Sequence, residues 1–159
     1  MAESVYIETS IFSFYHDRRT SPAVTAMREW IRQWWDGHRR RYSVITSTAV
    51  LAELDTGNLP HRDDALAMAM GLPAIPIEDD IHEIVEVYIK HRVMPNNPLG
   101  DALHLALASF HKCDYLLTWN CEHLANANKF GHIRRINALL ALHMPTLVTP
   151  LELMGGGER

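Results

Sequence analysis

Short apolar stretches alternate with amphipathic helical segments along most of the chain, and this alternation is what most constrains the fold. Runs of apolar and β-branched residues predict strands at 5–7, 43–46, 74–77, 115–119 and 146–149. Helical spacing of apolar residues predicts helices over 22–36, 49–54, 62–70, 81–89, 101–111 and 132–143. Strands that alternate with helices in this way indicate an α/β domain with a mostly parallel sheet.

The length of 159 residues fits one domain, which we expect to span residues 1–153, followed by a flexible tail at 154–159 that contains three consecutive glycines. The apolar share of 47% is too high for a disordered chain. No stretch approaches about 18 consecutive apolar residues, so we expect no membrane-spanning helix. The first residues lack a basic segment and an apolar signal core, so we expect a cytoplasmic protein.

The formal net charge of −4 argues against a protein that coats nucleic acid through overall positive charge. It does not exclude an enzyme that grips a short piece of nucleic acid locally. Two basic runs are either solvated surface or contacts for RNA phosphates: Arg39, Arg40 and Arg41, and Arg134 and Arg135. Trp35 lies off the apolar face of its predicted helix, which makes it a candidate contact for a partner.

Polar residues stand where the predicted sheet is expected to bind ligands, beyond the carboxyl ends of its strands. Glu8 ends the first strand and Asn120 ends the fourth, while Glu53 lies inside an apolar helix and Asp101 opens another. Carboxylates in apolar surroundings are costly unless something pairs with them. A set of oxygen ligands favours Mg²⁺ or Mn²⁺ over zinc, and such an ion supports phosphodiester hydrolysis.

Each of these residues also has a simpler interpretation on its own. Asp101 can cap its helix, Glu53 can lie on the surface or pair with an arginine, and Glu8 can end its strand in solvent. The metal-site hypothesis therefore depends on the three carboxylates lying together. His104 follows Asp101 by one helical turn and His123 follows the fourth strand, so both are candidate supporting residues.

Four segments occur in the order of a known set of motifs: VYIETSIFS at 5–13, AEL at 52–54, DALHLA at 101–106 and LLTWN at 116–120. They resemble the motifs of PIN-domain ribonucleases, and toxins of the VapC type from bacterial toxin–antitoxin pairs look nearest. The resemblance covers nearly the whole chain. It implies a PIN-like three-layer α/β/α sandwich with a mostly parallel central sheet, a metal-dependent endoribonuclease acting on RNA, a cognate antitoxin as partner, and a homodimer.

Carried over by position, the resemblance assigns catalytic roles to four residues, of which the first three match metal ligands: Glu8, Glu53, Asp101 and Asn120. Thr9 and Thr118 stand beside them in the same motifs. Two positions depart from the family pattern, because Glu8 replaces the usual Asp and Asn120 replaces a residue that is often acidic. Since Asn adds no negative charge, we expect lower metal affinity, and the nearby Glu122 is a candidate to compensate for it.

Two other interpretations remain open at the level of the sequence. The departures at Glu8 and Asn120 leave room for a catalytically weak or inactive PIN-like module that binds RNA or a protein partner. A phosphoacceptor domain of the receiver type also gathers acids at strand ends, but the third strand here continues into Glu78 without an acceptor Asp. A nuclease assay with and without a chelator separates the first interpretation from the catalytic one.

Overall fold

A five-stranded sheet forms the centre of the computed structural model, which describes residues 2–94 and 100–154. The strand order is β3-β2-β1-β4-β5, with β1 (Ser4–Ile7), β2 (Ser43–Ser47), β3 (Ala74–Ile75), β4 (Tyr115–Leu117) and β5 (Thr146–Val148). Every neighbouring pair is parallel, which confirms the predicted sheet. All five strands therefore end at the same edge, the carboxyl edge, and begin at the opposite amino edge.

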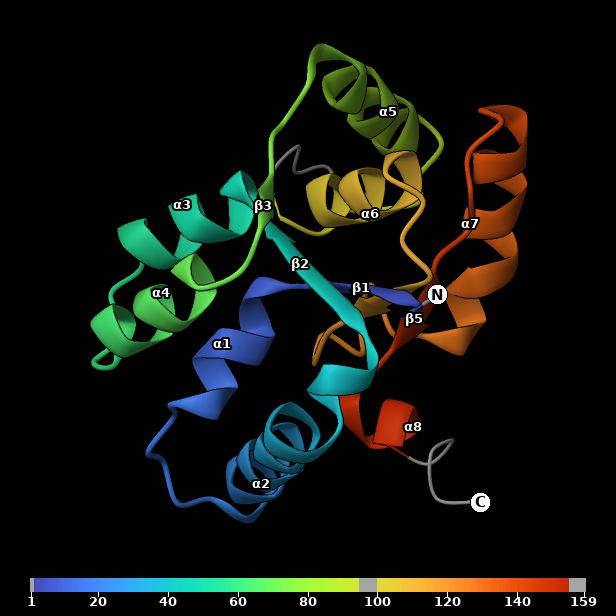
Figure 1. Ribbon diagram of the computed structural model, residues 1–159. Helices are drawn as coiled ribbons and strands as arrows, with labels where there is room; N and C mark the ends of the chain where they lie inside the picture. The colour runs from blue at the N-terminus through green and yellow to red at the C-terminus, as the bar shows by residue number, and fades with distance from the viewer. Residues whose placement is uncertain (1, 95–99, 155–159) are drawn as a thin grey trace.

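Helices cover both faces of this sheet and give the three-layer α/β/α arrangement (Figure 1). One face carries α5 (Asp79–Lys90), α6 (Asp101–Phe110) and α7 (Ala127–Leu139). The other carries α1 (Thr9–Tyr15), α2 (Pro22–Gly37) and α8 (Pro150–Met154). In the remaining pair, α3 (Thr48–Thr56) directly follows β2 and α4 (Arg62–Met70) precedes β3, and both pack against α1.

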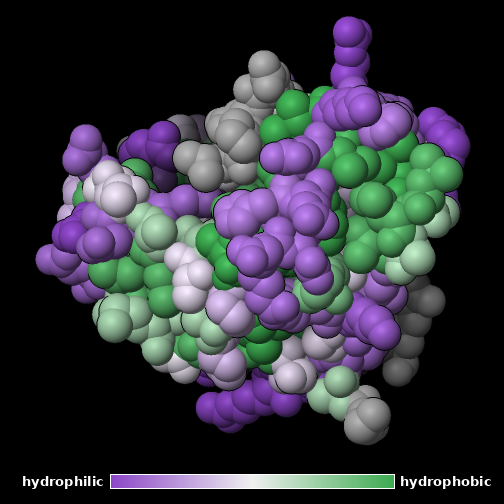
Figure 2. Space-filling model, turned by 90° about the horizontal axis from the view of Figure 1, so that it is seen from above, coloured by the Kyte–Doolittle hydropathy of each residue, from purple (hydrophilic) through white to green (hydrophobic). Residues whose placement is uncertain are grey.

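The most buried elements are those whose sequences are apolar on every side. The last three residues of the central strand, Val5, Tyr6 and Ile7, have no exposed surface, as expected for a parallel strand covered on both faces. Helix α6 is buried from Ala102 to Ser109, and it falls within the helix predicted at 101–111. By contrast α5 buries only one stripe, and hydrophilic residues gather across the middle of the face seen from above (Figure 2).

A closed set of hydrogen bonds joins α5, α6 and α7 inside this core. The hydroxyl of Tyr88 donates to Asn137 Oδ1 at 2.6 Å and lies 3.3 Å from Ser109 Oγ. In turn Asn137 Nδ2 donates to Ser109 Oγ at 3.0 Å and to the carbonyl of His143 at 3.1 Å. Burial raises the pKa of Tyr88 to about 12, so it stays neutral. We call Tyr88, Ser109 and Asn137 the Tyr88 network.

The element boundaries differ from the sequence prediction in several places. Two short helices, α1 and α8, were not expected from the pattern. Helix α7 spans Ala127–Leu139 instead of 132–143, because the side chain of Asn126 accepts a hydrogen bond from the backbone of Asn128 and starts the helix earlier. Strand β3 covers only two of the four residues predicted at 74–77.

Trp35 is also placed differently from the prediction of a partner contact. Only 7% of its surface is exposed, because its ring packs edge-on against Phe12 and Trp34. The tail predicted at 154–159 falls largely on residues 155–159, which, like residues 95–99, lie outside the described residues. Within the part of the chain that the structure describes, no helix combines the length and apolar character needed to cross a membrane.

Candidate active site

Glu8 lies directly after the central strand β1 and is only 6% exposed. Its Oε1 accepts hydrogen bonds from Ser10 Oγ and, at 2.6 Å, from Thr118 Oγ1, which follows β4. The backbone N–H of Glu8 donates to the carbonyl of Leu117, so the pairing of β1 with β4 continues past the strand end. The carboxylate of Glu8 is therefore fixed at the carboxyl edge instead of ending its strand in solvent.

Glu53 and His104 form an ion pair between α3 and α6. The distance from His104 Nε2 to Glu53 Oε1 is 2.6 Å, and Thr9 Oγ1 donates to Glu53 Oε2 at 2.9 Å. Burial by itself lowers the pKa of His104, but the hydrogen bond to Glu53 and the surrounding acids raise it overall. Burial also raises the pKa of Glu53, yet the bond to His104 outweighs it and leaves this pKa lowered. Glu53 therefore has a histidine partner, not an arginine.

The hydrogen bonds continue behind His104 into the core. Its Nδ1 lies 2.7 Å from the hydroxyl of Tyr6, which lies 2.7 Å from Ser47 Oγ. Burial raises the pKa of Tyr6, so its hydroxyl stays protonated. With both ring nitrogens protonated, His104 donates to Glu53 on one side and to Tyr6 on the other. We call Ser47, Tyr6, His104 and Glu53 the His104 network.

Asp101 occupies the first position of α6, after Gly100, whose φ of +76° favours glycine. Asp101 makes no capping bond of its own, because the N-cap position belongs to Gly100. Instead Asp101 Oδ1 accepts a hydrogen bond from Asn120 Nδ2 at 2.9 Å. The Oδ1 of Asn120 accepts from the backbone N–H groups of Glu122 and His123 at 3.2 and 3.0 Å. Asn120 thus turns its nitrogen toward Asp101 and uses its oxygen in the following turn.

These contacts join the residues of the carboxyl edge into one group. Thr118 Oγ1 donates to Glu8 and accepts a bond from the backbone N–H of Asn120 at 2.9 Å, and Asn120 reaches Asp101. The charges of Glu8, Glu53 and Asp101 all raise the pKa of His104, and Glu53 is in direct contact with its ring. We call Glu8, Glu53 and Asp101 the acid cluster.

The acid cluster presents two unpaired carboxylate oxygens. Within residues 2–94 and 100–154, no three His, Cys, Asp or Glu side chains are arranged to hold a metal ion. Both oxygens of Glu53 are hydrogen-bonded, whereas Glu8 Oε2 and Asp101 Oδ2 have no partner among the described residues and are not sealed from solvent. Mg²⁺ is commonly held by one or two carboxylates with water in its other positions. Glu8 and Asp101 therefore each offer a free oxygen to such an ion, whereas both oxygens of Glu53 are occupied by His104 and Thr9.

The basic runs singled out from the sequence lie away from the acid cluster. The 3₁₀-helix η1 (Arg39–Arg41) directly precedes β2 and so lies at the amino edge of the sheet. The guanidinium of Arg39 lies 4.7 Å from the ring centre of Trp35. Arg134 and Arg135 are exposed on α7, and Arg134 lines a hollow beside the first residue of β5. Their role as RNA contacts remains a prediction.

Two residues of the site were not found by the sequence reasoning. Ser10 donates to Glu8 and accepts a hydrogen bond from the backbone N–H of Trp119 at 2.9 Å. Its position two residues after Glu8, in the same motif, could have identified it as a site residue. Lys129 lies near Asp101: burial lowers the pKa of this lysine, while Asp101 and Glu122 raise it. The sequence did not identify Lys129, because it lies on α7 and outside the four motifs.

Comparisons with known proteins agree with this architecture. The PIN domain family matches residues 5–129. The fold is similar to VapC20 of Mycobacterium tuberculosis, described as a sarcin–ricin-loop-cleaving toxin, with a TM-score of 0.57 and 16% identity over 75% of this chain and 92% of that one. It is also similar to VapBC2 of Rickettsia felis bound to a promoter DNA fragment, with a TM-score of 0.51 and 13% identity over 92% of this chain and 96% of that one. No curated protein sequence matches the chain.

Proposed function

Because the chain belongs to the PIN domain family, we propose that it is a metal-dependent endoribonuclease that hydrolyses RNA phosphodiester bonds. The observation that carries this proposal is the acid cluster: Glu8 after β1, Glu53 of α3 and Asp101 of α6 all stabilise the charged form of His104, and Glu53 contacts its ring directly. This is the edge at which parallel α/β sheets bind their ligands. An acid cluster placed there has the charge needed to hold a divalent cation beside a phosphate.

In this proposal Glu8 and Asp101 would hold Mg²⁺ or Mn²⁺. A bound ion of this kind supplies an activated water and stabilises charge on a phosphoryl oxygen. Thr118 and Ser10 fix the Glu8 carboxylate, and Asn120 fixes that of Asp101 through its amide nitrogen. His104 keeps Glu53 ionised, so Glu53 would add its negative charge to the attraction for the ion.

We extend the proposal to the toxin of a VapBC-like toxin–antitoxin pair, a cytoplasmic protein that forms a homodimer and binds a cognate antitoxin. It is supported by the likeness of the fold to VapC20 and to the VapBC2 complex. The substrate would approach the carboxyl edge, where Lys129 supplies a positive charge beside Asp101. The arginines at 39–41 and at 134 and 135 would contact more distant parts of the RNA.

A second candidate function is a PIN-like module that binds RNA or a protein without cutting. It is favoured by the orientation of Asn120, whose oxygen is occupied by the backbone N–H groups of the next turn. It is also favoured by Glu53, whose two oxygens are already paired with His104 and Thr9. This function would need the residues at the carboxyl edge to bind a ligand without a cation.

The deciding experiment is cleavage of a mixed RNA substrate with Mg²⁺ or Mn²⁺ and with chelator. We expect cleavage only with the metal. Asp101→Asn should lower the cleavage rate by more than about 100-fold, which is the largest loss usual for residues that only support metal ligands. Asp80→Asn, which removes an exposed acid from α5, is the matched control and should keep the wild-type rate. Equal rates for Asp101→Asn and the control would refute the catalytic assignment.

Metal binding can be tested without activity through Asn120→Asp. This change places a carboxylate against Asp101, where the amide nitrogen now donates a hydrogen bond. Without metal, the two carboxylates repel each other and the melting temperature should fall. With Mn²⁺ the added charge should favour the ion, so the variant should gain more thermal stability from Mn²⁺ than the wild type. Equal Mn²⁺-induced shifts in melting temperature would exclude a cation beside Asp101.

A further inference from the structure

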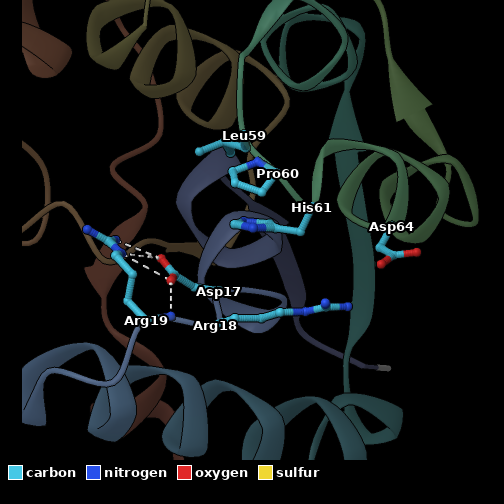
Figure 3. Close-up of a pocket in the computed structure, with 7 residues that line it drawn as sticks. All are labelled: Asp17, Arg18, Arg19, Leu59, Pro60, His61 and Asp64. Carbon is cyan, nitrogen blue, oxygen red and sulfur yellow. Dashed lines mark hydrogen bonds and ion pairs between the residues drawn. The ribbon is translucent and has the colours of Figure 1, made fainter.

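A cavity of about 590 Å³ opens between the α1–α2 loop and the α3–α4 loop, apart from the acid cluster (Figure 3). The first loop lines it with Asp17, Arg18 and Arg19, and the second with Leu59, Pro60 and His61. Helix α1 starts after Glu8 and ends shortly before this cavity, and it spans about 10 Å at the rise of an α-helix. This distance is short enough for an RNA strand bound at the acid cluster to place a nearby nucleotide in the cavity.

Both walls of the cavity are tied in place by arginines. On one side Arg28 Nη1 donates to the carbonyls of Asp17 and Arg19 at 2.6 and 3.0 Å. On the other, Arg62 Nε donates to the carbonyl of Asp55 at 2.7 Å and holds the α3–α4 loop against α3. Ligand sites are usually largely formed before the ligand binds. These hydrogen bonds hold both walls of the cavity in place without a ligand.

The imidazole of His61 is a buried polar group that lacks a partner. Its residue is only 9% exposed, and Nε2 is buried with no hydrogen bond among the described residues. Figure 3 shows the ring in the middle of the residues that line the cavity, between Pro60 and Asp17. Buried polar side-chain atoms are nearly always hydrogen-bonded, so an orphan at a cavity wall points to a ligand that supplies the missing bond.

The four charged side chains that line the cavity, Asp17, Arg18, Arg19 and Asp64, carry no net charge, which favours a neutral ligand. Arg19 is bonded to Asp17 by three hydrogen bonds from its guanidinium, and Asp64 of α4 balances Arg18. His16 lies beside these groups, and burial lowers its pKa, so it adds no charge near neutral pH. A phosphate would find no excess of positive charge here. The exposed guanidinium of Arg18 has no hydrogen-bond partner within the described residues and remains available for stacking.

We propose that this cavity receives an unpaired nucleobase of the RNA substrate. Single-stranded RNA is recognised by bases that are splayed out, stacked on histidine rings or arginine planes, and hydrogen-bonded along their edges. Leu59 and Pro60 supply the apolar wall, Arg18 the stacking plane, and His61 a hydrogen-bonding atom for the base edge. The inference rests on the proposed function for its choice of RNA, and it adds a base-selecting subsite to it.

The test measures RNA binding in chelator, so that nothing is cut, by fluorescence anisotropy with four short homopolymeric oligoribonucleotides and an abasic oligomer of equal length. The wild type should bind the base-bearing oligomers more tightly than the abasic one and should rank the four bases. Arg18→Ala should raise Kd for the base-bearing oligomers at least about fivefold, the lower range for a lost base stack. Lys90→Ala, which removes an exposed positive charge from α5, is the matched control.

His61→Phe provides a second readout, because it keeps a flat ring and removes both ring nitrogens. This variant should bind the four homopolymers with similar Kd values, so that base ranking is lost while affinity is largely kept. Equal binding of abasic and base-bearing RNA, or equal effects of Arg18→Ala and Lys90→Ala, would overturn the inference. Cleavage by the wild type together with such a result would leave the proposed nuclease function intact, whereas base-selective binding without any cleavage would remove that function alone.

Discussion

Two buried tyrosines anchor two hydrogen-bond networks of similar size with opposite character. The Tyr88 network joins α5, α6 and α7 through neutral groups only, and its bonds close on one another. The His104 network starts at an equally buried tyrosine, Tyr6, but runs outward through an imidazole to the carboxylate of Glu53. One network ends inside the core, and the other ends in a charge that solvent can reach.

The difference shows what buried polar groups do in this fold. A neutral, fully paired network specifies how three helices pack, because any other packing would leave its donors and acceptors unpaired. A network that ends in an ion pair at the carboxyl edge instead holds a carboxylate ionised in a chosen orientation. Stability should therefore depend on both networks, whereas only the His104 network of the two should affect activity.

The largest loss of stability is expected from Asn137→Ala. The side chain of Asn137 is 1% exposed and bonds Tyr88, Ser109 and a backbone carbonyl, so its removal leaves a cavity and unpaired groups. We expect a loss of about 3 kcal/mol in the free energy of unfolding. Urea denaturation measures this loss, and RNA cleavage at a temperature where the variant is folded should equal that of the wild type. Reduced cleavage by the folded variant would show that the Tyr88 network also affects activity, contrary to the comparison above.

His104→Gln should cost about 2 kcal/mol and should also reduce cleavage, because Glu53 loses its charged partner. The loss should depend on pH. The pKa of His104 is raised in the folded protein, so its contribution is complete below the ordinary value of 6.5 and disappears as the pH rises through the raised pKa. The wild type should therefore exceed the variant in stability by more at pH 6 than at pH 9.

Melting curves across this pH range check the prediction for His104→Gln. The control is His82→Gln, which changes an exposed histidine on α5. A stability difference from the wild type that stays constant with pH would mean that His104 is neutral in the folded protein.

The smallest and most closely matched change is Tyr→Phe at both tyrosines. Tyr6→Phe and Tyr88→Phe each remove one buried hydroxyl, so each should cost about 1 kcal/mol. Only Tyr6→Phe should slow cleavage, by about tenfold, because Tyr6 orients the imidazole that pairs with Glu53. Parallel unfolding and cleavage measurements on the two variants test this. Equal cleavage by both variants would show that the His104 network is as purely structural as the Tyr88 network.

The sequence predicts the sheet well because its information is local. Each strand is a short apolar run, and parallel pairing then brings the strand ends to one edge, where Glu8 and Thr118 lie. Helix α1 was missed because its seven residues are too few to establish a helical pattern. Trp35 was misplaced because α2 is covered on more than one side, which a single apolar stripe does not reveal.

The details of the site depend on contacts that local patterns do not contain. The partner of Glu53 is His104, which lies 51 positions further along the chain, on another helix. The orientation of Asn120 follows from backbone N–H groups of the next turn, which require an oxygen in front of them. The catalytic and metal-binding roles given to Glu8, Glu53, Asp101 and Asn120 stay predictions until cleavage and metal binding are measured.

The hydrogen bond between Glu8 and Thr118 spans 110 positions of the sequence and joins the first strand to the residue after the fourth. During synthesis the ribosome adds Glu8 before Asp101 and Thr118, and Thr118 follows Glu8 by 110 positions. Contacts of such separation form late, after the entropy of closing a long loop has been overcome. Any activity that needs the acid cluster is therefore absent from the growing chain until the segment that carries Asp101 and Thr118 has been made.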